Sequence, residues 1–286
     1  MKTAFIGALA LGLWLGAPLL AQSQSAAPEK IVSLGGSITE IAVALGAEDR
    51  LIGRDSTSLY PPSVLALPDV GYIRAISPEG VLSLAPDLIL AEGDAGPPAA
   101  VEVLKSAGIP FALMPHSPRP EDIPAKIRAV GEALQLAPAA EALAQALAAD
   151  LAKAKSRAEA LAEKKRVLFI LSLQNGSVMV GGQETSAEGI ITLAGGINAA
   201  EGVEGYKPLT DEAILQAAPD VLLMMDRSGD LAVLDEAIFA HPALSQTPAA
   251  QAGAILRMDG LLLLGFGPRT PEAADQLYTA LYGAVQ

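Results

Sequence analysis

The sequence contains no cysteine and only two histidines among its 286 residues. Without cysteine the chain can form no disulfide bond, and it has no thiolate that could act as a nucleophile or bind a metal. It also lacks the cysteine through which a lipid could anchor an exported binding protein to its membrane. The histidines, His116 and His241, are too few for a dedicated zinc or manganese site of three or four protein ligands.

Basic residues and enzyme signatures are scarce as well. The chain has 19 Lys and Arg against 32 Asp and Glu, which gives a formal net charge of −13. Such acidity argues against nucleic acid or an anionic membrane surface as a partner. There is no Gly-x-Ser-x-Gly turn and no P-loop, and Gly35-Gly36-Ser37 carries only a fragment of a phosphate-binding turn. We therefore expect that the protein is not an enzyme.

The N-terminus has the pattern of an export signal. Lys2 precedes an apolar run, residues 4–20, and small residues follow, so cleavage after Ala21 or Ala27 is expected. A transmembrane anchor is the alternative, but the run contains three glycines and a proline, and a polar tract follows at once. Removal of residues 1–27 would make the net charge one unit more negative. We expect a soluble periplasmic protein without a lipid anchor, and almost no indole fluorescence, because the only tryptophan lies in the leader.

A repeat is the most informative feature of what remains. Residues 77–90 (SPEGVLSLAPDLIL) return as residues 210–223 (TDEAILQAAPDVLL), and a Gly-Tyr pair precedes each copy. In both copies a short amphipathic helix ends before proline, and an apolar strand begins after aspartate. The pattern predicts two lobes built on one plan. Two such lobes facing each other form a cleft, which suits a ligand carrier.

Strands and helices alternate along the first half of the chain, which indicates βα units and a parallel sheet. Ser37 is expected to cap a helix that stops at Gly46, with Glu40 completing a capping box. Another helix is expected to run to Ala107. Short apolar strands are predicted at residues 30–34, 51–53, 88–90 and 111–114.

From Pro138 to about Lys164 the sequence is rich in Ala, Leu, Glu and Lys and has no further glycine or proline. These are strong helix formers, so we predict a rigid helical spine of roughly 38 Å rather than a flexible linker. Strands at residues 167–173 and 255–258 follow, and Pro271 is expected to open a last helix that reaches about Tyr282.

The predicted fold class is therefore α/β: two similar lobes, each with a mainly parallel sheet flanked by helices, joined by one long rigid α-helix, with a ligand cleft between the lobes. The predicted division is a signal peptide at 1–27, an N-terminal lobe at 28–137, a linking helix at 138–165 and a C-terminal lobe at 166–286.

The chain resembles the helical-backbone class of periplasmic binding proteins, which serve ATP-driven importers of cobalamin, siderophores and haem, and more narrowly the haem-binding subfamily. The likeness covers essentially all of residues 29–286. Four segments carry it: 54–61 (RDSTSLYP), 67–74 (LPDVGYIR), 205–209 (GYKPL) and 262–269 (LLLGFGPR). The first segment, which ends in Tyr-Pro, is the most discriminating for haem, whereas the repeat is specific only for the broader class.

The resemblance implies that Tyr60 is the axial ligand of ferric haem iron, bound as phenolate. Tyrosinate is a hard anionic oxygen donor that suits Fe(III). A phenol needs the charge of the iron and a nearby cation to ionise, and Arg74 and Arg54 are the candidates. Family members can have a basic residue close after the ligand, whereas Pro61 and Pro62 follow here, so the partner of the phenolate stays open. From the residues alone, a surface tyrosine in a turn before Pro61 is the favoured interpretation of Tyr60, and only the resemblance reverses this preference.

Other residues could complete a haem site. Arg227, at the carboxyl end of a predicted strand, is a candidate for a propionate contact or a surface ion pair. Arg269 is expected to hold a turn in place. His116 is a possible sixth iron ligand, although a solvated loop position is favoured, and His241 is expected in a surface loop. A packing role is expected for Tyr72 and Tyr206, and Met179 with Met224 or Met225 could face porphyrin or fill the core.

Glu79 and Glu212 occupy equivalent positions near the start of the repeated helix. The resemblance implies that they dock onto arginines of the membrane subunits of an importer. A purely local role is the alternative, because acids in the first helical turn interact favourably with the macrodipole.

The expected function is that of a monomeric periplasmic substrate-binding protein. It would capture ferric hemin, with haem b as the transported ligand, and deliver it to the permease dimer of an ABC transporter with its ATPase subunits. An outer-membrane haem receptor system would be an indirect partner. The alternative cargo is a ferric siderophore or a corrinoid. The clefts that bind those are usually rich in aromatic or arginine side chains, whereas aromatic residues make up 4% of this chain. An adhesion or scaffold module is disfavoured by the repeat.

Overall fold

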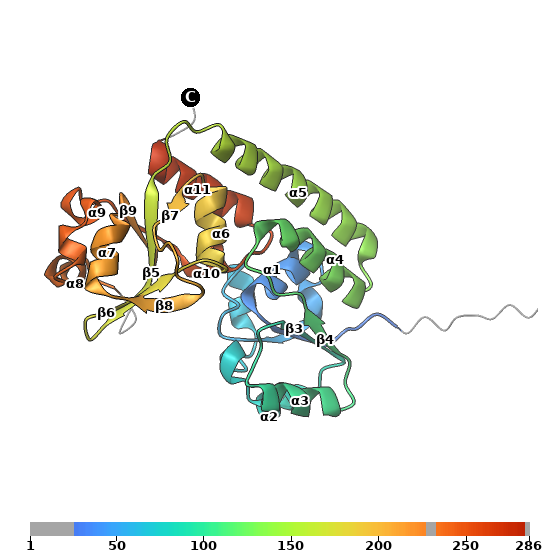
Figure 1. Ribbon diagram of the computed structural model, residues 1–286. Helices are drawn as coiled ribbons and strands as arrows, with labels where there is room; N and C mark the ends of the chain where they lie inside the picture. The colour runs from blue at the N-terminus through green and yellow to red at the C-terminus, as the bar shows by residue number, and fades with distance from the viewer. Residues whose placement is uncertain (1–25, 227–232, 284–286) are drawn as a thin grey trace, which may run out of the picture.

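The computed structural model describes residues 26–226 and 233–283. Two α/β lobes are joined by one long helix, α5 (Ala137–Glu159), which extends from the N-terminal lobe to the C-terminal lobe (Figure 1). Within the described ranges, no helix combines the length and the apolar character that a membrane span requires. The predicted fold class is confirmed.

The N-terminal lobe is built on a four-stranded parallel sheet with the order β2-β1-β3-β4. Its central strands, β1 and β3, are buried along their whole length, as expected when helices cover both faces of a parallel sheet. The strands are β1 (Ile31–Leu34), β2 (Leu51–Arg54), β3 (Leu88–Glu92) and β4 (Phe111–Met114). The helices are α1 (Gly36–Ala44), α2 (Pro78–Ser83), α3 (Pro98–Ser106) and α4 (Ile123–Ala133), with short 3-10 helices η1 (Glu48–Arg50), η2 (Pro62–Ala66), η3 (Ile73–Ala75) and η4 (Pro120–Asp122).

The C-terminal lobe has a mixed sheet with the order β10-β9-β5-β6-β8, and β7 pairs with β5. β5, β9 and β10 are parallel, whereas β6 is antiparallel to both β5 and β8. The strands are β5 (Arg166–Gln174), β6 (Ser177–Gly181), β7 (Ile197–Asn198), β8 (Tyr206–Leu209), β9 (Val221–Asp226) and β10 (Ile255–Asp259). The helices are α6 (Ser186–Leu193), α7 (Asp211–Ala217), α8 (Asp235–Ala240), η6 (Leu244–Gln246), α9 (Pro248–Gln251), α10 (Gly260–Leu264) and α11 (Thr270–Tyr282).

The spine, α5, ends earlier than its composition predicts. The helix formers continue to Lys164, but the helix stops at Glu159. The reason is a tertiary contact. Just beyond the helix end, Leu161 packs on Gly195 of the C-terminal lobe, so closely that a Cβ added to Gly195 would lie 2.5 Å from Cδ1 of Leu161. Packing on the C-terminal lobe therefore outweighs helix propensity at this end.

The repeated motif folds in the same way in both lobes. Ser77 and Thr210 cap α2 and α7, and their hydroxyls accept hydrogen bonds from the backbone N–H of Gly80 at 3.3 Å and of Ala213 at 3.2 Å. Such caps satisfy donors that the first helical turn leaves free.

The aspartate of each Pro-Asp pair ties the repeat to the first strand of its lobe. Asp87 Oδ1 accepts the backbone N–H of Lys30 at 2.9 Å, and Asp220 Oδ2 accepts that of Arg166 at 2.8 Å. The carbonyls of Lys30 and Arg166 in turn accept the N–H of their aspartate at 2.8 Å. The sequence repeat thus encodes a reciprocal clamp, which sets where the lobe's first strand begins.

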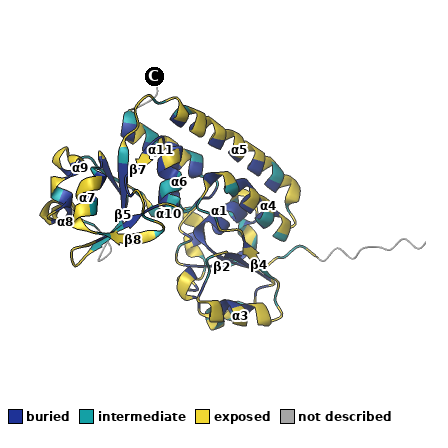
Figure 2. Ribbon diagram, viewed as in Figure 1, coloured by how far each residue is buried: buried dark blue, intermediate teal, exposed yellow. Residues whose placement is uncertain are grey.

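One hydrophobic core runs through both lobes and the spine, so the lobes are not separate bodies on a loose hinge. Figure 2 shows the buried residues along the sheets and the inner faces of the helices. The members of this core include Ile38 and Leu90 from the N-terminal lobe, Leu147 and Leu151 from the spine, and Phe169, Ile190, Phe266 and Leu277 from the C-terminal lobe. Close-packed interiors resist deformation, which limits the relative movement of the lobes.

Candidate functional site between the lobes

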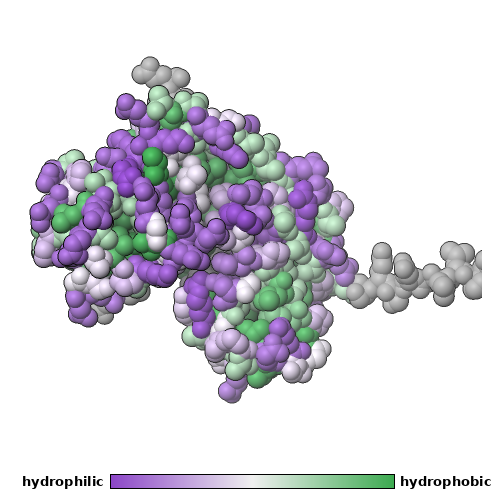
Figure 3. Space-filling view, viewed as in Figure 1, coloured by the Kyte–Doolittle hydropathy of each residue, from purple (hydrophilic) through white to green (hydrophobic). Residues whose placement is uncertain are grey.

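A notch separates the two lobes on the molecular surface (Figure 3). In open α/β sheets, ligands bind at the carboxyl ends of the strands, near the point where strand order reverses. Here that edge carries the loop after β2 with Tyr60, the end of β3 with Glu92 and Asp94, and His116 after β4.

A buried acid shapes the loop that carries Tyr60. Asp55, fully buried, accepts hydrogen bonds from the backbone N–H of Gly35 at 2.9 Å and from the hydroxyls of Thr57 at 2.6 Å and Ser58 at 2.7 Å. These bonds fix the loop to the start of α1. Tyr60 itself keeps 42% of its surface exposed, so its side chain is accessible from the solvent.

Arg54, at the end of β2, also stabilises this loop. Its guanidinium donates to the carbonyls of Val64 at 3.1 Å and Asp55 at 3.0 Å, and it forms an ion pair with Asp69 at 3.2 Å. This buried arginine therefore stabilises the backbone of the loop through its hydrogen bonds to those carbonyls. The structure does not bring it together with the phenol of Tyr60 as the sequence suggested.

The cation beside Tyr60 comes from the other lobe. Arg269, which follows α10, places its guanidinium carbon 3.6 Å from the centroid of the Tyr60 ring. Two hydrogen bonds to Glu40 of α1, at 3.1 and 2.5 Å, hold that guanidinium in place. The expectation that Arg269 holds a turn was wrong. Its side chain contacts Glu40 and Tyr60, which lie more than two hundred residues away and could not be found from the local sequence.

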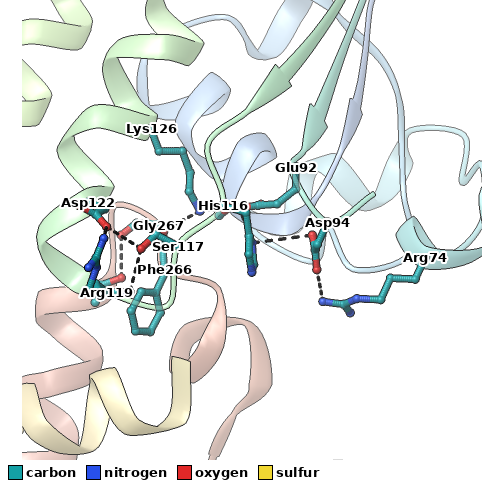
Figure 4. A network of polar contacts seen from close by, with 12 residues as sticks. Arg74, Glu92, Asp94, His116, Ser117, Arg119, Asp122, Lys126, Phe266 and Gly267 are labelled. Carbon is teal, nitrogen blue, oxygen red and sulfur yellow. Dashed lines mark hydrogen bonds and ion pairs between the residues drawn. The ribbon is translucent and has the colours of Figure 1, made fainter. Parts of the chain in front are cut away.

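A second cross-lobe contact lies next to the first. Lys126 of α4 is buried and donates to Glu92 at 2.5 Å, to Ser37 at 3.1 Å and to the carbonyl of Phe266 in the C-terminal lobe at 3.3 Å (Figure 4). Ser37 also donates to Glu92 at 2.6 Å. Burial alone would raise the pKa of Glu92, but the neighbouring His116 ring, the charge and hydrogen bond of Lys126, and the hydrogen bond from Ser37 hold it below its ordinary value.

The predicted capping box at α1 was therefore wrong. The N-cap is Gly35, and it has no side-chain cap. Ser37 and Glu40 point instead into the contact between the lobes. Gly36 lies where a Cβ would be 2.4 Å from Leu261 of α10, so this turn is packed against the other lobe rather than open to a phosphate.

One wall of the cleft carries a chain of polar groups. Arg74 donates to the hydroxyl of Tyr72 at 2.8 Å and pairs with Asp94. His116 Nδ1 lies 3.8 Å from Asp94 and 3.6 Å from Glu92 (Figure 4). The neighbouring Glu92 carboxylate is the main reason that the pKa of His116 is raised above its ordinary value, against an opposing effect of burial. His116 thus stands at the cleft, half-exposed, with acids on two sides.

Tyr72 and Tyr206 lie at equivalent positions of the two lobes and are 44% and 41% exposed, so they do not pack into a core as expected. Desolvation of the hydroxyl raises the pKa of Tyr206, against hydrogen bonds with Ala187 and Thr185 and the charge of Arg74. That arginine belongs to the opposite lobe, so Tyr206 faces it across the cleft.

The remaining predicted residues lie elsewhere. Glu79 and Glu212 are exposed in the first turns of α2 and α7. Arg227 lies outside the described residues. His241 is buried rather than in a surface loop, because its Nε2 lies 3.2 Å from the carbonyl of Gly176 and its Nδ1 accepts two backbone N–H groups at 3.3 Å.

Met224 is buried in the core of the C-terminal lobe and so cannot face the cleft, whereas Met179 and Met225 are partly exposed.

Chemically, the site offers the accessible phenol of Tyr60, with the guanidinium of Arg269 over its ring. Arg74 and His116 line the wall of the cleft. This set can supply one anionic oxygen to a Lewis acid and cations to an anionic ligand. In the part of the chain that the structure describes, no three His, Cys, Asp or Glu side chains are grouped as they would be to hold a bare metal ion.

Comparisons with known proteins agree with this architecture. The periplasmic heme-binding protein RhuT from Roseiflexus sp. RS-1, in its apo form, is 39% identical, with 90% of this chain and 99% of that chain covered and a TM-score of 0.85. Other solved structures that match are also periplasmic heme-binding proteins.

Two curated relatives are more distant in sequence. The ABC transporter substrate-binding lipoprotein YvrC of Bacillus subtilis, which is uncharacterized, is 28% identical over 89% of this chain and 80% of its own length. The vitamin B12-binding protein of Pectobacterium carotovorum is 27% identical over 74% of this chain and 76% of its own length. The model of the periplasmic binding protein family matches residues 31–261, and the chain therefore belongs to the periplasmic binding protein family.

Proposed function

We propose that this protein captures ferric haem between its lobes, with the Tyr60 phenolate as axial ligand of the iron, and delivers it to an ABC importer in the inner membrane. The observation that carries the proposal is the exposed phenol of Tyr60 with the guanidinium of Arg269 3.6 Å from its ring centroid. Phenolate oxygen suits Fe(III), and tyrosine is a known ligand of haem iron. The likeness to solved heme-binding proteins supports the same cargo.

The propionates of haem require cations at the rim of the cleft. Arg74 is the described candidate, because it stands on the cleft wall opposite Tyr206 and its side chain is 55% exposed. Arg227 remains a second candidate. Glu79 and Glu212, exposed on equivalent helices of the two lobes, are proposed to dock onto the permease subunits. Residues 1–27 are proposed to direct export and to be removed.

A corrinoid is the second candidate cargo, favoured by the vitamin B12-binding relatives. A corrinoid carries a cobalt ion with its own axial ligands and needs no phenolate from the protein. The pairing of an exposed tyrosine with a cross-lobe arginine is therefore unexplained under that hypothesis, whereas ferric haem uses both groups.

The test is a hemin titration of the mature chain, followed by visible absorption and calorimetry. We expect a high-spin ferric tyrosinate spectrum, which Tyr60→Phe abolishes. Tyr206→Phe is the matched control, because it removes the hydroxyl of an equally exposed cleft tyrosine and should keep the spectrum. If Tyr60→Phe binds hemin with an unchanged spectrum, Tyr60 is not the ligand. If cyanocobalamin binds and hemin does not, the cargo is a corrinoid.

A further inference from the structure

A short segment of the C-terminal lobe, residues 265–269, lies against the N-terminal lobe and is held there from two sides. We name it the interlobe strap. Lys126 donates to the carbonyl of Phe266 at its start, and Glu40 accepts two hydrogen bonds from Arg269 at its end. Gly267 between them packs on α1, because a Cβ there would be 3.5 Å from that of Ser37 and 3.3 Å from Glu40 Oε2.

The two anchors differ in what lobe separation would do to them. Lys126 keeps its ion pair with Glu92 inside the N-terminal lobe, at 2.5 Å, whatever the strap does. Glu40, only 6% exposed, takes its positive partner from the strap. Withdrawing Arg269 would leave a buried carboxylate without its countercharge, which is a costly state in a protein interior.

The same arginine covers Tyr60. Glu40 and Tyr60 both belong to the N-terminal lobe, whereas Arg269 enters between them from the C-terminal lobe. One rigid-body displacement of the strap would therefore break the ion pair and take the cation off the phenol at once. Because planar guanidinium groups have fixed donor directions, the two hydrogen bonds to Glu40 also set the tilt of Arg269 over the ring.

We propose that Glu40 is a positioning residue for the iron ligand, and that through Arg269 and the strap it makes ligation of ferric haem depend on the relative position of the lobes. This inference rests on the proposed function. In the closed arrangement the cation stabilises the phenolate on the iron. When a transporter displaces the lobes, Arg269 leaves, the Fe–O bond breaks with its electron pair on the phenolate oxygen, and that oxygen takes a proton from water while the iron stays ferric.

The first experiment compares the hemin complexes of the wild type and of Glu40→Gln. Haem dissociation is followed by transfer to apomyoglobin, and ligation by the energy of the tyrosinate-to-iron charge-transfer band. Glu40→Gln loses the charge-assisted pair, so we expect dissociation faster by on the order of tenfold and a shifted band. The control is Asp275→Asn, which removes the acid from a similar group outside the strap, where Arg157 pairs with Asp275 at 2.7 Å and its guanidinium carbon lies 4.1 Å from the centroid of the Tyr278 ring. It should change neither quantity.

The second experiment fixes the strap covalently. A Cβ on Gly267 would lie 3.5 Å from that of Ser37, within the range of a disulfide, and the wild-type chain has no cysteine to interfere. In the Ser37→Cys/Gly267→Cys variant, the oxidised protein should release haem several-fold more slowly than the same protein reduced and then freed of reductant. This comparison needs no Glu40 variant to fold.

The outcomes separate the two proposals. If the wild type does not bind hemin through Tyr60, the proposed function fails. If it does, but Glu40→Gln releases haem at the wild-type rate with an unshifted band, or the oxidised and reduced forms of the double variant release it equally fast, the coupling is overturned.

Discussion

Replacing Lys126 by methionine should destabilise the protein more than any change at its surface. The side chains of Lys126 and Glu92 are 4% and 9% exposed, and the ammonium donates to a carboxylate, a hydroxyl and a carbonyl from both lobes. Methionine fills a similar volume but leaves Glu92 buried without its countercharge. Removing one partner of a buried ion pair costs about 3–5 kcal/mol, a large part of the ~5–15 kcal/mol that stabilises a typical domain.

The dependence on pH follows from Glu92. In the wild type its pKa is lowered, so the stability it contributes is present above its unfolded pKa and is lost as pH falls through the folded value. In Lys126→Met, burial is no longer opposed by the ammonium, so the carboxyl should titrate at a higher pH and become neutral when folded. The deficit of the variant should therefore be smaller at pH 5 than at pH 8.

Urea unfolding followed by far-UV circular dichroism measures both effects, since the exported chain would lack tryptophan. Lys153→Met is the control: Lys153 pairs with Asp150 at 2.8 Å but is exposed, so no measurable change is expected. Lys126→Met/Glu92→Gln should recover part of the loss, because the unpaired charge is gone. A deficit below about 1 kcal/mol, or one that is equal at pH 5 and pH 8, would refute the reasoning.

Three further predictions follow from single features. Because the pKa of His116 is raised, the stability that its charge contributes is complete below its unfolded pKa of about 6.5 and is lost as pH rises through the folded value. His116→Asn should therefore lower Tm more at pH 5.5 than at pH 8.5, and an equal change at both would contradict this. Glu79→Ala and Glu212→Ala should leave hemin affinity unchanged but weaken stimulation of the importer's ATPase in proteoliposomes. Gly131→Ala should lower the free energy of unfolding by about 1–3 kcal/mol, because its Cβ would lie 2.1 Å from that of Ala140 on the spine; an unchanged urea midpoint would contradict this contact.

Local sequence patterns predicted the elements well where local interactions decide them. The strand at residues 111–114 and the last helix, to Tyr282, were placed correctly, because apolar runs and an N-terminal proline act within a few residues. The Pro-Asp repeat also led to the two-lobed plan. Its aspartates make the same backbone contacts in each lobe, so the pattern in the sequence has a direct structural meaning.

The antiparallel hairpin shows a local signal that was present but not used. Asn175 and Gly176 both adopt positive φ, 50° and 75°, between β5 and β6. An Asn-Gly pair between apolar strands is the strongest short-range signal for a tight hairpin, and it explains why the second sheet is mixed. The buried state of His241 depends on this turn, since its ring contacts the carbonyl of Gly176.

The site was predictable only in part, because half of it is assembled by tertiary contacts. The flanking sequence of Tyr60 led to its prediction as the iron ligand, which remains a proposal. Its cation was sought among nearby arginines, although the structure provides Arg269 from a segment more than two hundred residues away. Ser37 and Glu40 have the spacing of a capping box, and that local interpretation was wrong because both side chains meet partners from other elements.

The pairing of charges in the cleft bears on how an acidic protein can hold an anionic cargo. The net charge of −13 opposes a haem with two ionised propionates, but at physiological salt such repulsion fades beyond about 8 Å. Among the described residues near the site, Arg269 is matched by Glu40 and Arg74 by Asp94, so neither arginine adds an unpaired positive charge. Net attraction therefore cannot be the main source of affinity. Under the proposed function, the iron–phenolate bond and the burial of the porphyrin would supply the affinity, so the placement of a single guanidinium over Tyr60 would control retention.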